Sequence, residues 1–410
     1  MKRIMMMCLV ALLAVTGSWA SDKMDLKRLT QGEFSARRIS GIDPLAGTDQ
    51  YAQISQDGKQ IVQYSFKTGK KTGVLFDVNN TQGEKISAFD GYMMAPDGKR
   101  MLIRTNTQMI YRRSYKAEFY IYTVGTRKLE RLSTVWSPDG TQVAFMRDNN
   151  IFLVKLLYDN SESQVTKDGK FNEIINGVPD WVNEEEFSFN SALTFNADGT
   201  MLCWLKYDES KVKEYSLQLF KGMSPERKEY EVYPGSYSYK YPKAGEDNSK
   251  VSAWSYDIKS HKTQQLQVPL DADGYMPRIL PTDNADKILV YTMNRHQDVL
   301  NLYTVNPRST LSQLLIKESV AKYIKEEAME AIRVGKDYIL MPSDRDGFMH
   351  LYLYDQNGKL LRKIGAGNYD ITSVYGYDEK TGDVYYQAAS LNPHDRQILV
   401  THKNGKTDRL

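Results

Sequence analysis

Short runs in which apolar and polar residues alternate recur along the whole chain, and turn residues separate them. Many runs follow an Asp-Gly pair, as after Ser55-Gln56-Asp57-Gly58, Ala95-Pro96-Asp97-Gly98, Ser137-Pro138-Asp139-Gly140 and Asn196-Ala197-Asp198-Gly199. Proline fixes φ and glycine accepts a positive φ, so these sequences suit tight turns between strands. The pattern predicts an all-β chain of short antiparallel strands.

Strands rich in aromatic residues repeat at intervals. Their centres are Phe76, Ile121, Phe152, Leu217, Tyr256, Tyr303, Leu353 and Leu399, spaced by 45, 31, 65, 39, 47, 50 and 46 residues. A period in the forties is typical of propeller blades. Eight centres therefore predict a β-propeller with eight blades. The alternative is a pair of β-sandwiches in which the turn repeats arise by chance.

Two of these spacings are irregular. The interval of 31 residues is too short for a full blade, because Arg131 lies almost directly before the turn at Ser137. We therefore expect an imperfect third blade. The interval of 65 residues surrounds the acidic motif Glu184–Glu186, and Tyr233–Asn248 behind it is an excursion from a blade.

One stretch has helical spacing. Val320, Ile324, Ala328 and Ile332 recur at i, i+4 and predict a helix over residues 318–331, although a strand with a misleading pattern would also fit.

Residues 1–20 have the features of a signal peptide. Lys2 and Arg3 precede an apolar run from Met5 to Val15, and Ser18-Trp19-Ala20 supplies small residues for cleavage. The apolar run is too short for a stable membrane span. We expect export to the periplasm or secretion, with a mature chain of residues 21–410 that has no membrane anchor.

Composition narrows the function classes. The chain has 54 basic and 51 acidic residues, a balance that favours neither nucleic acid nor an anionic membrane as a partner. Cys203 is the one cysteine beyond the signal region, so internal disulfides are not expected, and its apolar neighbours predict a buried side chain. The five histidines are scattered without ligand spacing, and no metal site, nucleotide loop or other cofactor is expected.

Three adjacent carboxylates, Glu184 to Glu186, follow Asp180 by a few residues. Like charges repel, so gathering them at one turn contributes little to stability. The motif is either a solvated acidic surface or a site that meets a cation such as an arginine or a protonated amine.

Three segments carry a more specific pattern: Tyr111-Arg112-Arg113-Ser114-Tyr115, Asn176-Gly177-x-x-Asp180-Trp181-Val182-x-Glu184-Glu185-Glu186 and Tyr241-Pro242-Lys243-Ala244-Gly245. In this order they resemble the dipeptidyl peptidase IV group of prolyl-oligopeptidase-like serine peptidases. The likeness extends over the whole mature chain.

The resemblance implies an eight-bladed propeller that caps a separate α/β-hydrolase domain and serves the release of X-Pro or X-Ala dipeptides. By position, Glu185 and Glu186 would hold the free N-terminal ammonium of a peptide. Arg112 would orient the peptide and the glutamates, with Arg113 in its place if the register slips by one. Ser188 would line the same pocket. Family members also dimerise, partly through an arm that matches residues 233–248.

Catalysis in this family needs a serine in Gly-x-Ser-x-Gly, and the sequence has no such motif. The nearest segment, Gly235–Tyr239, lacks the closing glycine. We therefore assign no catalytic residue and expect the chain alone to be inactive, with the hydrolase domain absent. A truncated gene product and a stand-alone exported propeller that binds peptides or a protein both remain open; a downstream reading frame encoding Gly-x-Ser-x-Gly favours the first. A glycan-cleaving propeller fits less well, because the carboxylates cluster in one insertion.

Overall fold

The computed structural model describes residues 25–35, 41–131, 137–158, 161–223 and 226–410, and divides into two compact units. The smaller unit holds the described residues up to 56 together with 60–75. It contains the short helix α2 (Leu26–Thr30), the strands β1 (Asp43–Pro44), β2 (Gln50–Ile54) and β3 (Gln60–Ser65), and all but the last two residues of β4 (Lys71–Asp77), which together form one sheet. The predicted signal peptide lies outside the described residues.

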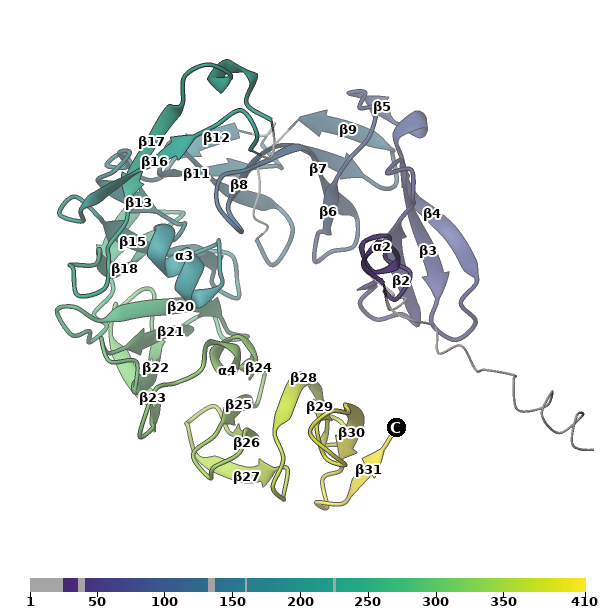
Figure 1. Cartoon of the computed structure of the whole chain (residues 1–410), viewed down its shortest axis with the longest axis vertical. Coiled ribbons are helices and arrows are strands. Elements are labelled where there is room, and N and C mark those ends of the chain that lie inside the picture. Colours follow the sequence, from purple (N-terminus) through teal and green to yellow (C-terminus); the bar gives the residue numbers. More distant parts are fainter. Residues whose placement is uncertain (1–24, 36–40, 132–136, 159–160, 224–225) are drawn as a thin grey trace, which may run out of the picture. The chain divides into compact units, whose positions relative to one another are not determined.

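The larger unit, residues 57–59 and 76–410, is a succession of sheets that follow one another in chain order (Figure 1). After the 3₁₀-helix η1 (Val78–Asn80), the first sheet consists of β5 (Gln82–Gly83), β6 (Gly91–Met94), β7 (Arg100–Met109), β8 (Tyr115–Thr123) and β9 (Lys128–Arg131). The next consists of β10 (Gln142–Arg147), β11 (Asn150–Lys155) and β12 (Ser161–Gln164). Within these two sheets, neighbouring strands pair antiparallel except β5 with β9.

Four more sheets complete this unit. One has β13 (Ile174–Asn176), β14 (Leu193–Phe195), β15 (Met201–Asp208), β18 (Lys250–Asp257) and β19 (Lys262–Gln265). The next sheet has β20 (Tyr275–Pro281), β21 (Ile288–Met293), β22 (Val299–Val305) and β23 (Ser312–Ser319). It is followed by a sheet of β24 (Arg333–Val334), β25 (Ile339–Ser343), β26 (His350–Tyr354) and β27 (Leu360–Ile364). The last sheet has β28 (Ile371–Asp378), β29 (Asp383–Ala388), β30 (Gln397–Thr401) and β31 (Thr407–Arg409). The prediction of an all-β chain is confirmed.

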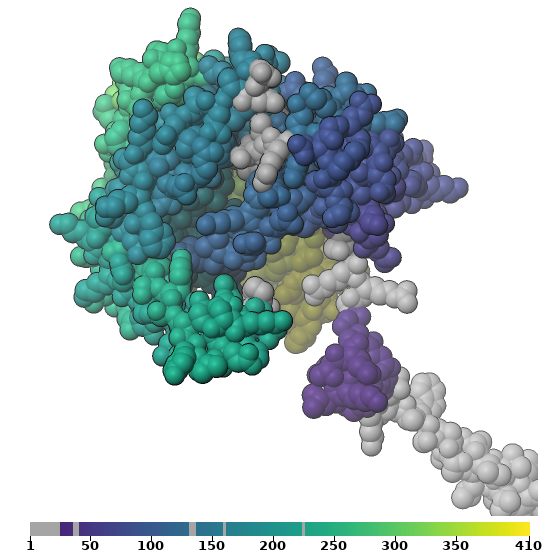
Figure 2. All heavy atoms as spheres, turned by 90° about the horizontal axis from the view of Figure 1, so that it is seen from above, coloured from purple at the N-terminus to yellow at the C-terminus, as the bar shows by residue number. Residues whose placement is uncertain are grey.

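The prediction of eight blades is wrong, because the described residues form seven blade-like sheets of three to five strands. The error comes from Leu217, which lies on β16 (Glu214–Leu219) of a separate two-stranded hairpin with β17 (Gly235–Lys240). Its alternating pattern is that of a strand, but this strand does not belong to a blade. The 3₁₀-helix η2 (Lys228–Tyr230) lies in the connection, and the hairpin tip, in green-teal, projects from the surface of the unit (Figure 2).

The third blade-like sheet, β10–β12, has three strands in the part of the chain that the structure describes. The strand that the sequence predicted to be missing would fall on residues 132–136, which lie outside the described residues. The expectation of an imperfect blade therefore stays a prediction for its inner edge.

Hydrophobic cores lie between successive sheets, so a central strand is buried on both faces. On β15, Leu202 and Trp204 pack with Leu153 of the preceding sheet. Cys203 and its alternate neighbours pack with Val290 of the following sheet. Burial on both faces explains the unbroken apolar run Met201–Leu205, and it confirms Cys203 as a buried free thiol.

The predicted helix over residues 318–331 is confirmed only in part, because it is much shorter than expected. Glu318 is still in β23, and the helix α4 covers only Glu326–Glu330. The N–H groups of Val320 and Ile324 donate to the Asp298 and Gln297 carbonyls (3.0 and 2.7 Å) of the adjoining loop instead of bonding within a helix. The four apolar residues share an i, i+4 spacing because they line the same small pocket beside α4, not because they lie on one helix.

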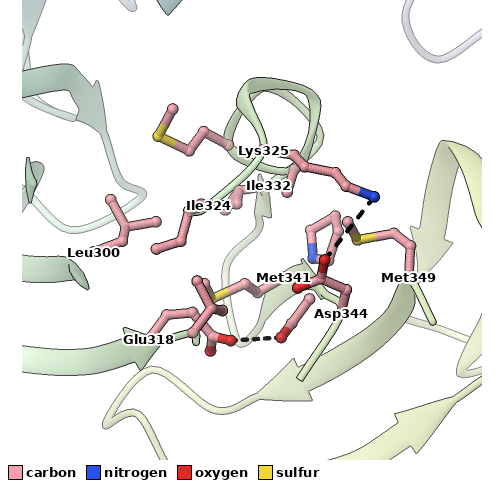
Figure 3. A pocket seen from close by; sticks show the side chains of 13 residues that line it. Leu300, Glu318, Ile324, Lys325, Ile332, Met341, Asp344 and Met349 are labelled. Carbon is pink, nitrogen blue, oxygen red and sulfur yellow. Dashed lines mark hydrogen bonds and ion pairs between the residues drawn. The ribbon is translucent and has the colours of Figure 1, made fainter. Parts of the chain in front are cut away.

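A small pocket lies between α4 and strands β23 and β25 (Figure 3). Glu318 faces it and accepts a hydrogen bond from the Ser343 hydroxyl (2.5 Å), while Lys325 lies 3.9 Å from Asp344 across it. The enclosed space is about 10 Å³, which holds about one water molecule. This pocket is therefore too small for a peptide.

The Asp-Gly turns have the predicted geometry. Gly58, Gly98, Gly140 and Gly199 all have φ between 66° and 69°. In each turn the aspartate carboxylate accepts the N–H group two residues on, at 2.8 to 3.2 Å. The side chain thus satisfies a donor that the turn leaves free, while glycine avoids the cost of a left-handed backbone.

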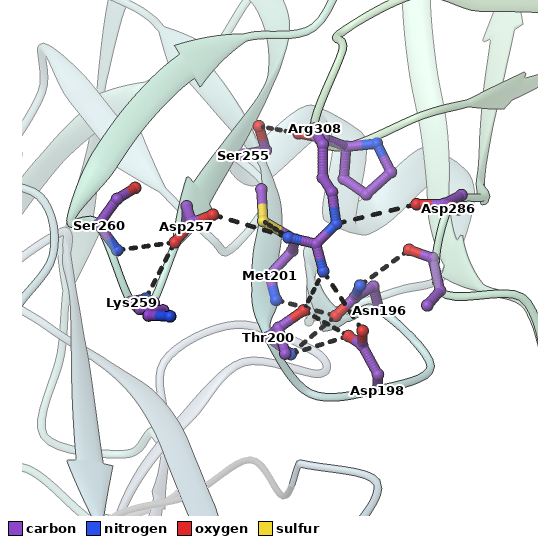
Figure 4. A network of polar contacts seen from close by, with 12 residues as sticks. Asn196, Asp198, Thr200, Met201, Ser255, Asp257, Lys259, Ser260, Asp286 and Arg308 are labelled. Carbon is purple, nitrogen blue, oxygen red and sulfur yellow. Dashed lines mark hydrogen bonds and ion pairs between the residues drawn. The ribbon is translucent and has the colours of Figure 1, made fainter.

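One of these turns joins two sheets through Arg308 (Figure 4). The guanidinium lies 3.3 Å from Asp198, 3.6 Å from Asp257 and 3.8 Å from Asp286, and it donates to the Thr200 hydroxyl at 2.5 Å. These side chains are partly exposed, so each ion pair contributes less than about 1 kcal/mol. The network aligns the turn ends of the sheets containing β15 and β21.

Candidate functional site

The acidic motif forms helix α3 (Trp181–Phe187), which follows β13 and precedes β14. Asp180 caps the helix, since its carboxylate accepts the N–H of Asn183 at 2.9 Å. Asp180, Asn183, Glu184 and Phe187 form the buried side of the helix, at i, i+3, i+4 and i+7. This spacing decides which of the three adjacent glutamates is buried.

The chain enters the helix through Asn176 and Gly177. The Asn176 side chain accepts the indole N–H of Trp204 (3.1 Å) and donates to Asp168 (3.0 Å). Gly177 has φ of 81°, and a Cβ at this position would lie 3.2 Å from side-chain atoms of Ile151. Glycine is therefore required here by both backbone conformation and space.

Glu184 is fully buried and binds the loop between β7 and β8. Its carboxylate accepts the backbone N–H groups of Arg113 and Ser114, both at 2.8 Å, and the Ser114 hydroxyl. Asn190 donates to the Arg113 carbonyl at 2.8 Å from the other side. These contacts join segments about 70 residues apart and place Arg112 beside helix α3.

Arg112 and Glu185 form an ion pair, with 2.6 Å between Nη2 and Oε1. The Arg112 side chain is 70% exposed and that of Glu185 is 23% exposed, so the pair faces solvent. Glu186 is exposed on the same helix, and its carboxylate has no hydrogen bond or ion pair with any described residue. The structure therefore pairs Arg112 with Glu185 and leaves the next residue of the helix, Glu186, exposed.

Arg113 does not take the place of Arg112. Its guanidinium points to the end of α3, where it donates to the Glu184 carbonyl (3.3 Å) and to the Ser188 hydroxyl. Ser188 ends the helix in the left-handed region, with φ of 53°. Since a carbonyl at a helix C-terminus lacks a partner within the helix, Arg113 acts as a cap there. Ser188 thus lies next to the expected site, but its hydroxyl already accepts a hydrogen bond from Arg113.

Sequence reasoning missed the separate role of Glu184. The signal was present, because Phe187 and Asp180 lie three and four residues from Glu184 and mark the inner side of a helix. What the sequence does not contain is the partner loop, which comes from another sheet.

Glu209, at the end of β15, is a second buried carboxyl near this site. Burial, and then the negative charge of Asp180, raise the pKa of Glu209 to about 7, while Lys240 acts in the opposite direction. Burial also raises the pKa of Asp180, although the hydroxyl of Ser249 and the amide of Asn183 donate to it.

The described residues contain no group of three His, Cys, Asp or Glu side chains arranged to hold a metal ion. A second hollow, of about 420 Å³ and open to solvent, lies on β28–β30 and involves none of the expected site residues. None of the helices that the structure describes is long and apolar enough to span a membrane.

Comparison with known proteins identifies the family. The "Dipeptidyl peptidase IV (DPP IV) N-terminal region" matches residues 95–410, which is more than half of the chain. The chain belongs to the dipeptidyl peptidase IV family. The resemblance inferred from the three segments is thereby confirmed.

Relatives in this family include a probable dipeptidyl-aminopeptidase B of Tuber melanosporum, 29% identical over 95% of this chain and 47% of the relative. A probable dipeptidyl peptidase 4 of Aspergillus fumigatus is 27% identical over 91% of this chain and 50% of its own length. The chain thus spans about half the length of these members of the family.

Among solved structures, dipeptidyl peptidase 4 of Porphyromonas gingivalis is similar to this chain, with a TM-score of 0.88 and 36% identity. The match covers 95% of this chain and 55% of that protein. A putative dipeptidyl aminopeptidase IV of Bacteroides ovatus, 18% identical with a TM-score of 0.65, has the same fold. The seven sheets are thus blades of a β-propeller, the N-terminal propeller portion of this family.

Proposed function

We propose that this chain is the substrate-recognition and gating propeller of a dipeptidyl peptidase IV-like serine peptidase. It binds the free N-terminal ammonium of a peptide through Glu185 and Glu186, while Arg112 holds Glu185 in place. The chain itself supplies recognition, and we assign it no catalytic residue. The observation that carries the proposal is the Arg112–Glu185 pair at 2.6 Å beside the unpaired carboxylate of Glu186.

The charges of the site support an amine ligand. One guanidinium and the two carboxylates of Glu185 and Glu186 together carry a net charge of about −1, which a single ammonium neutralises. Each charge-assisted hydrogen bond from the ammonium to a carboxylate contributes roughly 1.5–3 kcal/mol. An amine fixed at this point also sets the distance to a peptide bond further along the substrate, which selects dipeptide release.

Calorimetric titration of the full chain with a short X-Pro peptide tests the proposal. We expect binding of the free peptide and roughly 10-fold or greater loss on N-acetylation, since 1.4 kcal/mol corresponds to a factor of ten. Glu185→Gln and Glu186→Gln should each lower the affinity for the free peptide by a similar factor.

Glu162→Gln is the matched control. Glu162 pairs with Arg147 at 2.6 Å on a neighbouring sheet, so the variant removes the same charge from a similar ion pair away from α3. Equal binding of the free and acetylated peptides, or equal effects of Glu162→Gln and Glu185→Gln, contradicts amine recognition.

We also propose a homodimer through the hairpin arm, residues 233–248 with β16. Val232 and Tyr233, in the connection between β16 and β17, are each 80% exposed, which is unusual for apolar and aromatic side chains of this size. Sedimentation velocity of the chain and of a Val232→Ser/Tyr233→Ser variant tests this; a monomer at every concentration contradicts it. Export to the periplasm or secretion stays a prediction.

A further inference from the structure

The hairpin β16–β17 has two different faces. Its strands pair Tyr215 with Tyr239 and Leu217 with Tyr237, so these side chains share one face. The opposite face carries Ser216, Gln218, Ser236 and Ser238. Solubility alone does not require an aromatic face on a projecting hairpin, so this face is expected to pack against another part of the chain.

Tyr239 contacts both halves of the candidate site. Its ring centroid lies 5.8 Å from that of Trp181, the first residue of α3. It also lies 5.8 Å from the ring of Tyr111, the residue before Arg112. Tyr239 is only 6% exposed, although it belongs to a hairpin outside the blades. One side chain of the arm therefore lies between the helix that carries the glutamates and the loop that carries the arginine.

Neighbouring rings extend this contact. Tyr241 stacks on Trp181, with centroids 4.1 Å apart and planes at 26°, and also contacts Tyr239. The pKa of the Tyr239 phenol is raised, mainly by burial. Tyr241 and Tyr237 add to this effect, and so does the negative charge of Glu185. The carboxylate of Glu185 thus lies close enough to Tyr239 to interact with it electrostatically, although Tyr239 makes none of the ion pairs of the site.

The site is consequently held from two sides. Glu184 binds the loop to α3 from within the propeller through the N–H groups of Arg113 and Ser114. Tyr239 packs against the same two segments from the side of the arm. Each contact restricts the loop and helix relative to one another, and a geometry fixed by two contacts is better defined than one fixed by a single contact.

We propose that the hairpin β16–β17 is a positioning element of the amine-binding site, and that Tyr239 fixes the Arg112 loop against helix α3. The effect on ligand binding rests on the proposed function; the effect on the loop does not.

Hydrogen exchange at the backbone amides of Arg113 and Ser114 tests the positioning role directly, because both donate to Glu184 only while the loop is seated. Tyr239→Ala should accelerate exchange at these two amides by roughly tenfold or more, relative to the amides of Leu302 and Tyr352 in distant sheets. Tyr239→Phe keeps the ring and should restore the native rate.

Ser238→Ala is the matched control, because Ser238 is adjacent on the same strand but exposed on the polar face. The inference is overturned if Tyr239→Ala leaves the two loop amides within twofold of the native rate. It is equally overturned if the distant amides accelerate as much as the loop amides, because Tyr239 then supports the whole fold and has no selective effect on the site.

Titration with free and N-acetylated X-Pro peptides separates this inference from the proposed function. Tyr239→Ala should lower the affinity for the free peptide about as much as Glu185→Gln does, and should leave the affinity for the acetylated peptide unchanged. If the native chain does not distinguish the two peptides, the proposed function fails while the exchange experiment still decides the positioning role.

Discussion

Replacement of Glu184 tests the structural basis of the site most directly. In Glu184→Ala, the N–H groups of Arg113 and Ser114 lose an acceptor that lies at 2.8 Å from each. The Ser114 hydroxyl loses its partner as well. Glu184→Gln is the conservative variant, because its amide oxygen still accepts both N–H groups and its NH₂ can donate to the Ser114 hydroxyl.

The magnitude follows from these contacts. An unsatisfied buried donor costs roughly 1–3 kcal/mol, so two orphaned N–H groups imply about 2–6 kcal/mol. Water that enters the space of the removed side chain lowers this value, and we expect a loss of about 2–4 kcal/mol in the free energy of unfolding. Glu184→Gln loses charge assistance alone and should cost about 1 kcal/mol.

Urea unfolding followed by tryptophan fluorescence measures these losses, with Glu186→Ala as a control. Glu186 is exposed on the same helix, so its replacement should change stability by less than about 0.5 kcal/mol. If Glu184→Ala is no more destabilising than Glu186→Ala, the buried carboxylate does not hold the loop and the reasoning is refuted.

Two further predictions concern Glu209 and Cys203. The pKa of Glu209 rises from 4.5 to about 7 on folding, so its contribution to stability is complete below pH 4.5 and is lost as the pH rises through 7. The native chain should therefore lose up to about 3 kcal/mol more than Glu209→Gln between these pH values, as measured by urea unfolding; parallel curves would contradict the raised pKa. Burial raises the pKa of the Cys203 thiol, so iodoacetamide should leave Cys203 unmodified in the native chain and alkylate it in urea, as read by peptide mass; rapid native labelling would contradict its burial.

The repeat of turns predicted the blades well because it depends on local chemistry. An aspartate and a glycine fix each turn, as at Asp139 and Gly140, whatever the turn contacts. The blade count failed at Leu217 because alternation defines a strand but not the sheet that it joins. The helix predicted over residues 318–331 is too long for a similar reason, since the acceptors for Val320 and Ile324 come from a loop more than 20 residues earlier in the sequence.

The candidate site shows the same division. Adjacent acids in one short segment identified α3, and the resemblance supplied Arg112 as a partner for Glu185. The assignment of Glu184 as the buried acid, and the place of Tyr239 between loop and helix, depend on packing among three segments. Such packing is set by the fold as a whole and cannot be read from local spacing.

The seating of the β7–β8 loop on α3 has a consequence for the blade between them. The sheet β10–β12 lies in the stretch of chain that this contact closes into a ring of about seventy residues. Any ligand that tightens the contact therefore also protects the intervening sheet against local opening, by thermodynamic linkage. Conversely, a substitution in the buried core of β10–β12 that opens the sheet should lower peptide affinity, whereas the exposed change Glu162→Gln leaves the sheet closed and the affinity unchanged.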